Sequence, residues 1–180
     1  PGERPASEHV RVITTVARIR GLCAEDVPAA AQILVTNGTG GTLGETEAEV
    51  RTALSHLLGC AEVFVAAVDD TVAGIACFLA DGVFAHGGLL RFLVVRQEMR
   101  RKGIGRQLLG FVERKVFQRS QNLYVLVPES DEPMLMFLQA VGYIKVGEMS
   151  DPAVVDGPQL ILRKAAEGGG TRRRVRATQP

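Results

Sequence analysis

Hydrophobic and polar positions follow two periods along the chain, and each change of period predicts a change of element. Runs rich in β-branched residues predict strands over 16–22, 63–68, 72–79, 89–95, 123–127, 143–146 and 159–162. Apolar residues at helical spacing predict helices over 26–35, 45–58, 103–117 and 133–141. The predicted order is β-α-α-β-β-β-α-β-α-β-β. Because helices and strands mix without strict alternation, we expect an α/β (α+β) fold whose central sheet is partly antiparallel and partly parallel, flanked by about four helices.

Single residues mark several of the expected boundaries. Asp26 is expected to cap the first helix, with Pro28 in the first turn, where its missing N–H is tolerated. The pair Asp69-Asp70 lies between two strand runs and predicts a hairpin turn. On the third helix, the apolar stripe predicts that Glu113 lies on the opposite, polar face.

The composition fits one globular domain with a substantial core, since 46% of the 180 residues are hydrophobic and 23% are charged. We expect a polar N-terminal arm over 1–10, a single domain over 11–164 and a flexible basic tail over 165–180. No apolar run reaches the roughly 20 residues of a membrane span, and residues 1–9 hold no signal-peptide core. The three cysteines are sparse and form no C-x-x-C pair, which fits a reducing compartment. We therefore expect a cytoplasmic protein with no membrane partner and no metal.

Positive charge is concentrated in one stretch of the chain. Residues 91–119 hold nine basic and two acidic side chains, a net charge of +7, although the whole chain carries only +1. A chain-wide polycation that coats nucleic acid is therefore disfavoured, and we expect no nucleic-acid partner. One alternative stays open. The helix over 103–117 and the arginine-rich segment 172–176 would then bind nucleic acid or an acidic protein, with a steep salt dependence.

The start of the helix over 103–117 carries two glycines, Gly103 and Gly105, although glycine disfavours helices by about 1 kcal/mol relative to alanine. A bulky anion that approaches the backbone would explain them, because N–H groups at a helix N-terminus bind phosphate. Neither the P-loop pattern nor the dinucleotide fingerprint is present, since Leu108 stands where the third glycine of the fingerprint would be. The pattern that remains is Arg-x-x-Gly-x-Gly, beginning at Arg100.

This pattern, after a strand that ends Leu93-Val94-Val95, resembles the pyrophosphate-binding loop of the GNAT superfamily of N-acetyltransferases. Weaker similarity in segments 17–26 and 137–143 extends the resemblance over residues 16–163. It implies an acyl-CoA-dependent N-acetyltransferase, in which an amine attacks acetyl-CoA directly within a ternary complex.

The resemblance also implies which residues contact acetyl-CoA. Backbone groups of Leu93 and Val95 would pair with the pantetheine arm, and N–H groups from Arg101 to Arg106 would cradle the pyrophosphate. This strand would part from the strand over 123–127, and one of its N–H groups would stabilise the oxyanion. The cofactor-binding residues expected in this way are Leu93, Val94, Val95, Arg100, Arg101, Lys102, Gly103, Ile104, Gly105 and Arg106.

The chain departs from the family where catalytic side chains are common. Leu138 stands at the position of the family's tyrosine acid, and Arg91 and Phe92 stand where a glutamate base is frequent. Asp131 replaces a frequent asparagine. The identity of the acid and base is therefore unknown, although transfer can proceed by positioning alone. The alternative function is a catalytically weak module that binds or senses CoA.

Substitute catalytic side chains are few. His86, Tyr124 and Ser130 are weak candidates, and capping of the late helix is the favoured interpretation for Ser130 and Asp131. Tyr143 is favoured as a core residue, and Cys77 as a buried small apolar residue.

The resemblance implies that the acceptor is a small-molecule amine or a protein amine. The acidic residues Asp81, Glu148, Asp151 and Asp156, in segments expected to border the acceptor, give a weak indication of a cationic acceptor. A homodimer is implied by the family resemblance alone.

Overall fold

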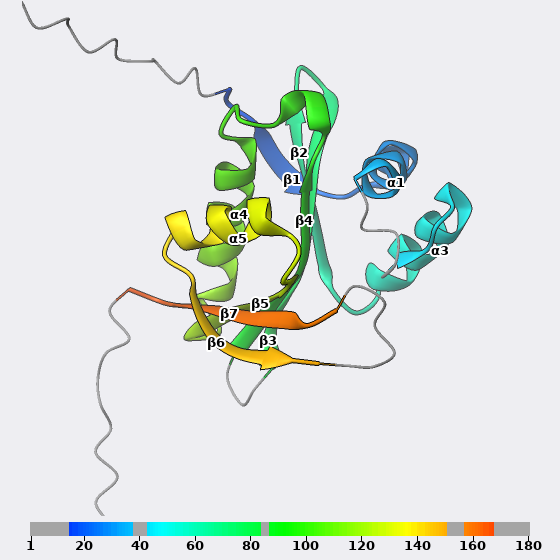
Figure 1. Ribbon diagram of the computed structural model, residues 1–180. Helices are drawn as coiled ribbons and strands as arrows, with labels where there is room; N and C mark the ends of the chain where they lie inside the picture. Colours follow the sequence, from blue (N-terminus) through cyan, green and yellow to red (C-terminus); the bar gives the residue numbers. More distant parts are fainter. Residues whose placement is uncertain (1–14, 38–42, 84–86, 151–156, 168–180) are drawn as a thin grey trace, which may run out of the picture.

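The computed structural model describes residues 15–37, 43–83, 87–150 and 157–167. These residues form a seven-stranded sheet with helices on both faces, and the strand order is β1-β2-β3-β4-β5-β7-β6 (Figure 1). The strands are β1 (Arg18–Gly21), β2 (Glu62–Val68), β3 (Thr71–Val83), β4 (Gly87–Val95), β5 (Asn122–Pro128), β6 (Ile144–Met149) and β7 (Gln159–Ala165). The helices are α1 (Val27–Thr36), α3 (Glu47–Leu57), α4 (Ile104–Val116) and α5 (Glu132–Ala140), with short 3-10 turns η1 (Ala24–Asp26) and η2 (Gln97–Met99).

The predicted element order and the mixed sheet are confirmed. β4 and β5 are the parallel pair, and the other neighbouring strands run antiparallel. The hairpin turn at Asp69 and Asp70 is also confirmed, because both residues adopt positive φ, +47° and +60°, as a type I′ turn requires. β3 runs four residues beyond its predicted end at Leu79, where an irregular register with β4 continues to the pair Val83↔Gly87.

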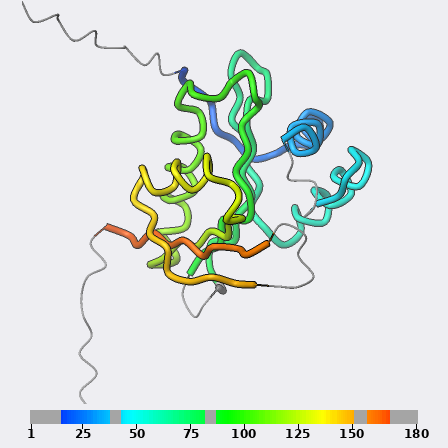
Figure 2. The backbone as a smooth tube through the Cα atoms, viewed as in Figure 1, coloured from blue at the N-terminus to red at the C-terminus, as the bar shows by residue number. Residues whose placement is uncertain are grey.

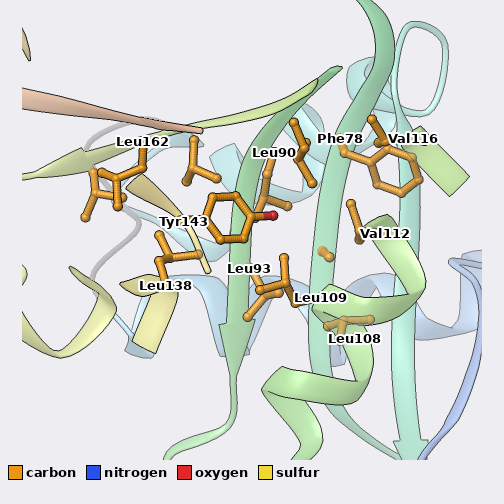
Figure 3. Packing of buried hydrophobic residues seen from close by; sticks show 14 of the residues in the cluster. Phe78, Leu90, Leu93, Leu108, Leu109, Val112, Val116, Leu138, Tyr143 and Leu162 are labelled. Carbon is orange, nitrogen blue, oxygen red and sulfur yellow. The ribbon is translucent and has the colours of Figure 1, made fainter. Parts of the chain in front are cut away.

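Two hydrophobic clusters lie on opposite faces of the sheet, and alternation along β3 supplies both. Ala76 and Phe78 belong to the cluster under α4 and α5, which we call the α4/α5 face. Ile75 and Cys77 belong to the cluster under α1 and α3, the α1/α3 face. Figure 3 shows the first cluster, in which side chains of α4 pack against β3 and β4.

Asp26 lies at the N-cap position of α1, as predicted, with Pro28 in the first turn, but its carboxylate does not cap that helix. Asp26 has helical backbone angles, and its side chain makes no capping hydrogen bond to α1. Instead its Oδ1 accepts from Arg20 Nη2 at 2.8 Å, and its Oδ2 accepts from the backbone N–H of Cys23 at 3.0 Å. The Arg20 guanidinium holds the pKa of the Asp26 carboxyl well below its usual range. The carboxylate therefore ties β1 to the turn that precedes α1, a contact between residues six positions apart that helix patterning does not reveal.

Glu113 also departs from its prediction, because the side chain is only 15% exposed and lies against β7, where Lys164 Nζ is 2.8 Å from its Oε2. The Tyr143 side chain is buried beside them, as predicted for a core residue. Burial, and then the charge of Glu113, raise the pKa of the Tyr143 hydroxyl above its ordinary value. A helix position that looks polar in sequence thus carries a half-buried ion pair that joins α4 to β7.

Replacing Asp26 with asparagine is expected to lower the free energy of unfolding at neutral pH by about 2 kcal/mol, since charge-assisted hydrogen bonds are lost. The pKa of Asp26 is lower in the folded state, so its stabilisation is complete above about pH 5 and decreases as the pH falls through about 4. Urea unfolding of both proteins from pH 7 to pH 3 checks this. The difference should shrink with acidity, and a difference independent of pH would contradict it. Replacing the exposed Glu25 with glutamine is the control.

Candidate active site

The parallel pair β4–β5 separates partway along its length. Its register runs from Gly87↔Asn122 to Leu90↔Val125. Beyond Leu90, β4 pairs only with β3, and beyond Val125, β5 pairs only with β7. Figure 2 follows β4 upward, through a loop, into α4, which turns back alongside the sheet. The upper part of β4 therefore has one backbone edge that no strand of the described chain covers.

A β-bulge in β4 coincides with this separation. The register with β3 shifts between the pairs Cys77↔Phe92 and Phe78↔Leu90, so Arg91 is the extra residue. Bulges bend a strand and re-aim its side chains, and they are frequent beside active sites. The bulge therefore lies at the residue where β4 leaves β5.

Backbone groups of two predicted residues face the separation. Arg96 N donates to Ala73 O at 2.8 Å. Because hydrogen-bonded pairs alternate along an antiparallel ladder, the backbone groups of Val94 face β3. Those of Leu93 and Val95 consequently face away from β3, toward the open edge. The side chain of Val94 is buried on the α1/α3 face, so neither its backbone nor its side chain is directed to the open edge.

The loop after β4 presents backbone N–H groups at the mouth of the separation. Gly103 has φ +82° and lies before the helix, whereas the sequence placed it in the first turn, and Arg101 also has a positive φ, +63°. From Arg101 to Arg106, no backbone N–H has an acceptor within the described part of the chain. These donors lie at the positive end of α4, so the loop is suited to bind an anion.

Gly105 lies between this loop and α5. A Cβ at Gly105 would be 3.6 Å from a methyl carbon of Val95, 3.8 Å from one of Leu93 and 3.8 Å from the Phe137 ring, which are ordinary contact distances. The backbone at Gly105 also has no positive φ. The fold therefore does not require glycine at 105, in contrast to 103, and its bare backbone faces β4 and α5 at the open edge.

The cations of this loop are not equivalent. The Arg100 side chain turns back to β4, where its Nε donates to Val95 O at 3.1 Å, and its guanidinium also donates to the side chain of Asn37. Arg101 and Arg106 are exposed and have no charged partner among the residues described. Among the described residues, the Lys102 ammonium group has only the weakly accepting sulfur of Met99 as a partner. Arg100 thus fixes the loop, and the other three supply free positive charge.

The structure removes several side chains from consideration as acid or base. Leu138 is fully buried in the core of the α4/α5 face, and Phe92 packs on the α1/α3 face. Burial raises the pKa of the Cys77 thiol to about 11, so it is not a thiolate nucleophile at neutral pH. Asp131 caps α5, as predicted, since its carboxylate accepts from Met134 N at 3.1 Å.

Two of the three weak catalytic candidates, Ser130 and Tyr124, lie in the described part of the chain, and they are not brought together. Ser130 is exposed in the turn before α5. Tyr124 is half-buried, and its strand neighbours Leu89 and Arg163 place it on the sheet face opposite the α4/α5 core. His86 lies outside the described residues.

A pocket of about 600 Å³ between α3 and the bulge of β4 was not predicted from sequence. Its lining residues are Leu43, Ala48, Glu49, Thr52, Ala53, His56, Leu57, Cys60 and Arg91. The only signal for this pocket in the sequence was Arg91, which stands where the family frequently has a glutamate base. Its role as bulge residue depends on pairing with β3, which periodicity cannot show.

Within the described ranges, no three His, Cys, Asp or Glu side chains are grouped so as to hold a metal ion. The helices in those same ranges are too short or too polar to cross a membrane.

The model of the GNAT acetyltransferase family matches residues 39–143, which span α3, the separated strands, the anion-binding loop and α5. The chain therefore belongs to the GNAT acetyltransferase family. A search of curated proteins finds no match.

Solved structures show the same fold at low sequence identity. Ribosomal-protein-alanine N-acetyltransferase from Brucella melitensis is 21% identical, with a TM-score of 0.67, and the match covers 83% of this chain and 99% of the other. The acetyltransferase of the GNAT family from Streptococcus pneumoniae is 18% identical, with a TM-score of 0.64, covering 83% and 99%. A GNAT family acetyltransferase from Elizabethkingia anophelis, solved with acetyl-CoA bound, is 15% identical, with a TM-score of 0.66, covering 83% and 98%.

Replacing Gly103 and Gly105 with alanine is expected to change the free energy of unfolding in opposite directions. Gly103→Ala places a Cβ in left-handed backbone and should lower the free energy of unfolding by about 1 kcal/mol. Gly105→Ala should raise it by up to about 1 kcal/mol, because alanine favours the helix and has room. Urea unfolding measures both, and Gly110→Ala in the same helix is the control for the helical gain. A loss of stability in Gly105→Ala would mean that the fold itself needs this glycine.

Proposed function

We propose that this chain is an N-acetyltransferase that transfers an acetyl group from acetyl-CoA to an amine in a ternary complex. The observation that carries the proposal is the meeting of two features. The open backbone edge of β4 at Leu93 and Val95 leads to a loop whose N–H groups, from Arg101 to Arg106, have no acceptor in the described chain. The open edge suits the amide groups of the extended pantetheine arm of acetyl-CoA. The loop N–H groups suit the pyrophosphate of the same molecule.

The residues present fit acetyl-CoA in this arrangement. Leu93 and Val95 would pair with the pantetheine amides as a neighbouring strand does. The N–H groups at the start of α4 would hold the pyrophosphate against the bare backbone of Gly105, and Arg101, Lys102 and Arg106 would add charge around it. Arg100 positions this loop through its bond to Val95 O rather than binding phosphate with its guanidinium.

Acetyl-CoA supplies the acyl group as a thioester, and a neutral amine forms the C–N bond while the C–S bond breaks and the CoA thiolate leaves. The chain's own contribution is to hold both partners and to place backbone donors of β4 near the bulge at Arg91, where the carbonyl oxygen gains charge. Neither Leu138 nor Phe92 can exchange a proton, so the amine would lose its proton to water or another group, and the leaving thiolate would take one from solvent or from a different side chain. Holding the reactants together supplies a large part of the rate enhancement in such a site.

Replacing Gly105 with glutamate is expected to weaken acetyl-CoA binding about tenfold or more, equivalent to about 1.4 kcal/mol, since a carboxylate would enter the anion-binding loop. Isothermal titration of acetyl-CoA measures the effect. Gly110→Glu is the matched control, because it adds the same charge to the same helix, and the Cβ at 110 contacts only the Arg114 side chain. Equal affinities of the two variants would contradict the assigned loop.

The alternative, a CoA-binding module without turnover, is separated by a steady-state acetylation assay over a panel of amines. We expect turnover that rises with pH as the acceptor amine loses its proton. Tight acetyl-CoA binding with no product from any amine would establish the module instead. Failure of the folded wild type to bind acetyl-CoA would overturn both functions.

A further inference from the structure

The pocket between α3 and β4 borders the proposed acetyl-transfer site at one residue. Arg91 lines the pocket and is also the bulge at which β4 separates from β5. A molecule in the pocket that contacts Arg91 therefore lies where the open edge of β4 begins. This places the pocket, rather than the open edge itself, as the candidate location of the acetyl acceptor.

The charges that line the pocket are not equally available. Glu49 is committed to its own helix, since its Oε2 accepts from the backbone N–H groups of Glu45 and Thr46, each at 3.0 Å. These bonds hold the pKa of Glu49 below its usual value, so it stays ionised and already compensated. Arg91 is exposed and has no ion-pair or hydrogen-bond partner in the described part of the chain. The charge in the pocket that is left to bind a ligand is therefore positive.

The rest of the lining is mostly small or apolar. Leu43, Ala48, Ala53 and Leu57 contribute hydrocarbon surface, while Thr52, His56 and Cys60 contribute polar atoms. A ligand with an apolar body and one anionic group matches this combination of surface and charge. A guanidinium fork binds a carboxylate with two parallel hydrogen bonds, which makes a carboxylate the best match for Arg91.

We propose that the acetyl acceptor is an amino acid with an apolar side chain, whose carboxylate binds Arg91 and whose side chain occupies the pocket. This rests on the proposed function for the acetyl transfer, but the carboxylate site is a property of Arg91 alone. It opposes the cationic acceptor suggested by acidic residues in the sequence. Of those residues, Glu148 pairs with Lys145 at 3.0 Å on β6, Asp81 is exposed, and Asp151 and Asp156 lie outside the described residues.

The test compares two probes, L-leucine and L-leucinamide, which differ in the carboxylate. Each is titrated into the 180-residue chain by calorimetry, with and without CoA, for wild type and for Arg91→Gln. We expect Arg91→Gln to weaken L-leucine binding about tenfold or more and to leave L-leucinamide binding within about twofold, because only the carboxylate uses the guanidinium. The amine pKa of L-leucinamide differs from that of L-leucine. This difference cancels when the effect of Arg91→Gln on one probe is compared with its effect on the other.

Two further variants keep the outcome specific. Arg114→Gln removes another exposed positive charge that has no partner in the described residues and does not line the pocket, so L-leucine should bind as in wild type. Arg91→Lys retains the charge without the fork and should restore part of the lost affinity. The urea unfolding midpoint of Arg91→Gln should match that of wild type, which shows that the variant is folded whether or not acetyl-CoA binds.

Equal loss of both probes in Arg91→Gln, or wild-type affinity that does not favour L-leucine over its amide, would overturn the proposal. No binding of L-leucine, L-methionine or L-phenylalanine at millimolar concentration would also overturn it. These results are independent of the proposed function, because titration without CoA tests Arg91 even if acetyl-CoA does not bind. Conversely, acetyl-CoA binding without any carboxylate preference would leave the proposed function intact and remove only the amino-acid acceptor.

Discussion

The separation of β4 from β5 is the constraint on which the site depends. A strand edge left without partners inside a protein is unfavourable, because each buried N–H or C=O that lacks a partner costs about 1–3 kcal/mol. β4 tolerates an open edge because β3 pairs with its other side as far as Val95, and β5 is held in the same way by β7. One of the exposed acceptors, Val95 O, is satisfied by Arg100. The remaining groups are available for a ligand that completes the ladder.

The elements around the separation are held by contacts that reach across the fold. Gln107 of α4 accepts from Ala17 N at 3.1 Å and donates to Thr15 O at 2.6 Å, so the chain before β1 is fixed to the helix that begins at the anion-binding loop. Glu113 and Lys164 join the same helix to β7. α4 is therefore attached to both flanks of the sheet, and its N–H donors are oriented before any ligand arrives. Donors that are oriented in advance bind an anion without the cost of first ordering the loop.

The sequence predicted the local features and missed those that depend on contacts between distant segments. Periodicity was sufficient to predict the order of strands and helices, and the glycine pattern was sufficient to predict the loop before α4. Both predictions depend only on residues that are close in sequence. The bulge at Arg91 follows from its register against β3, and the burial of Glu113 follows from Lys164, 51 residues away. Asp26 stands at the predicted N-cap position of α1, but its carboxylate binds Arg20, a strand residue, instead of the helix. A polar side chain buried by a distant partner looks like a surface residue in sequence.

The basic stretch around α4 is divided by the fold rather than displayed as one surface. Arg119 pairs with Glu62 at 2.8 Å, and Lys115 lies 5.8 Å from the centre of the Phe111 ring. Much of the remaining charge gathers at two points on either side of the open edge, the loop before α4 and the bulge at Arg91. Val95 lies four positions after Arg91 in extended chain, a span of about 13 Å. Two separate anion-binding points with an open backbone edge between them suit two small anionic substrates that react in that interval, whereas the continuous phosphate backbone of a nucleic acid favours an unbroken basic surface.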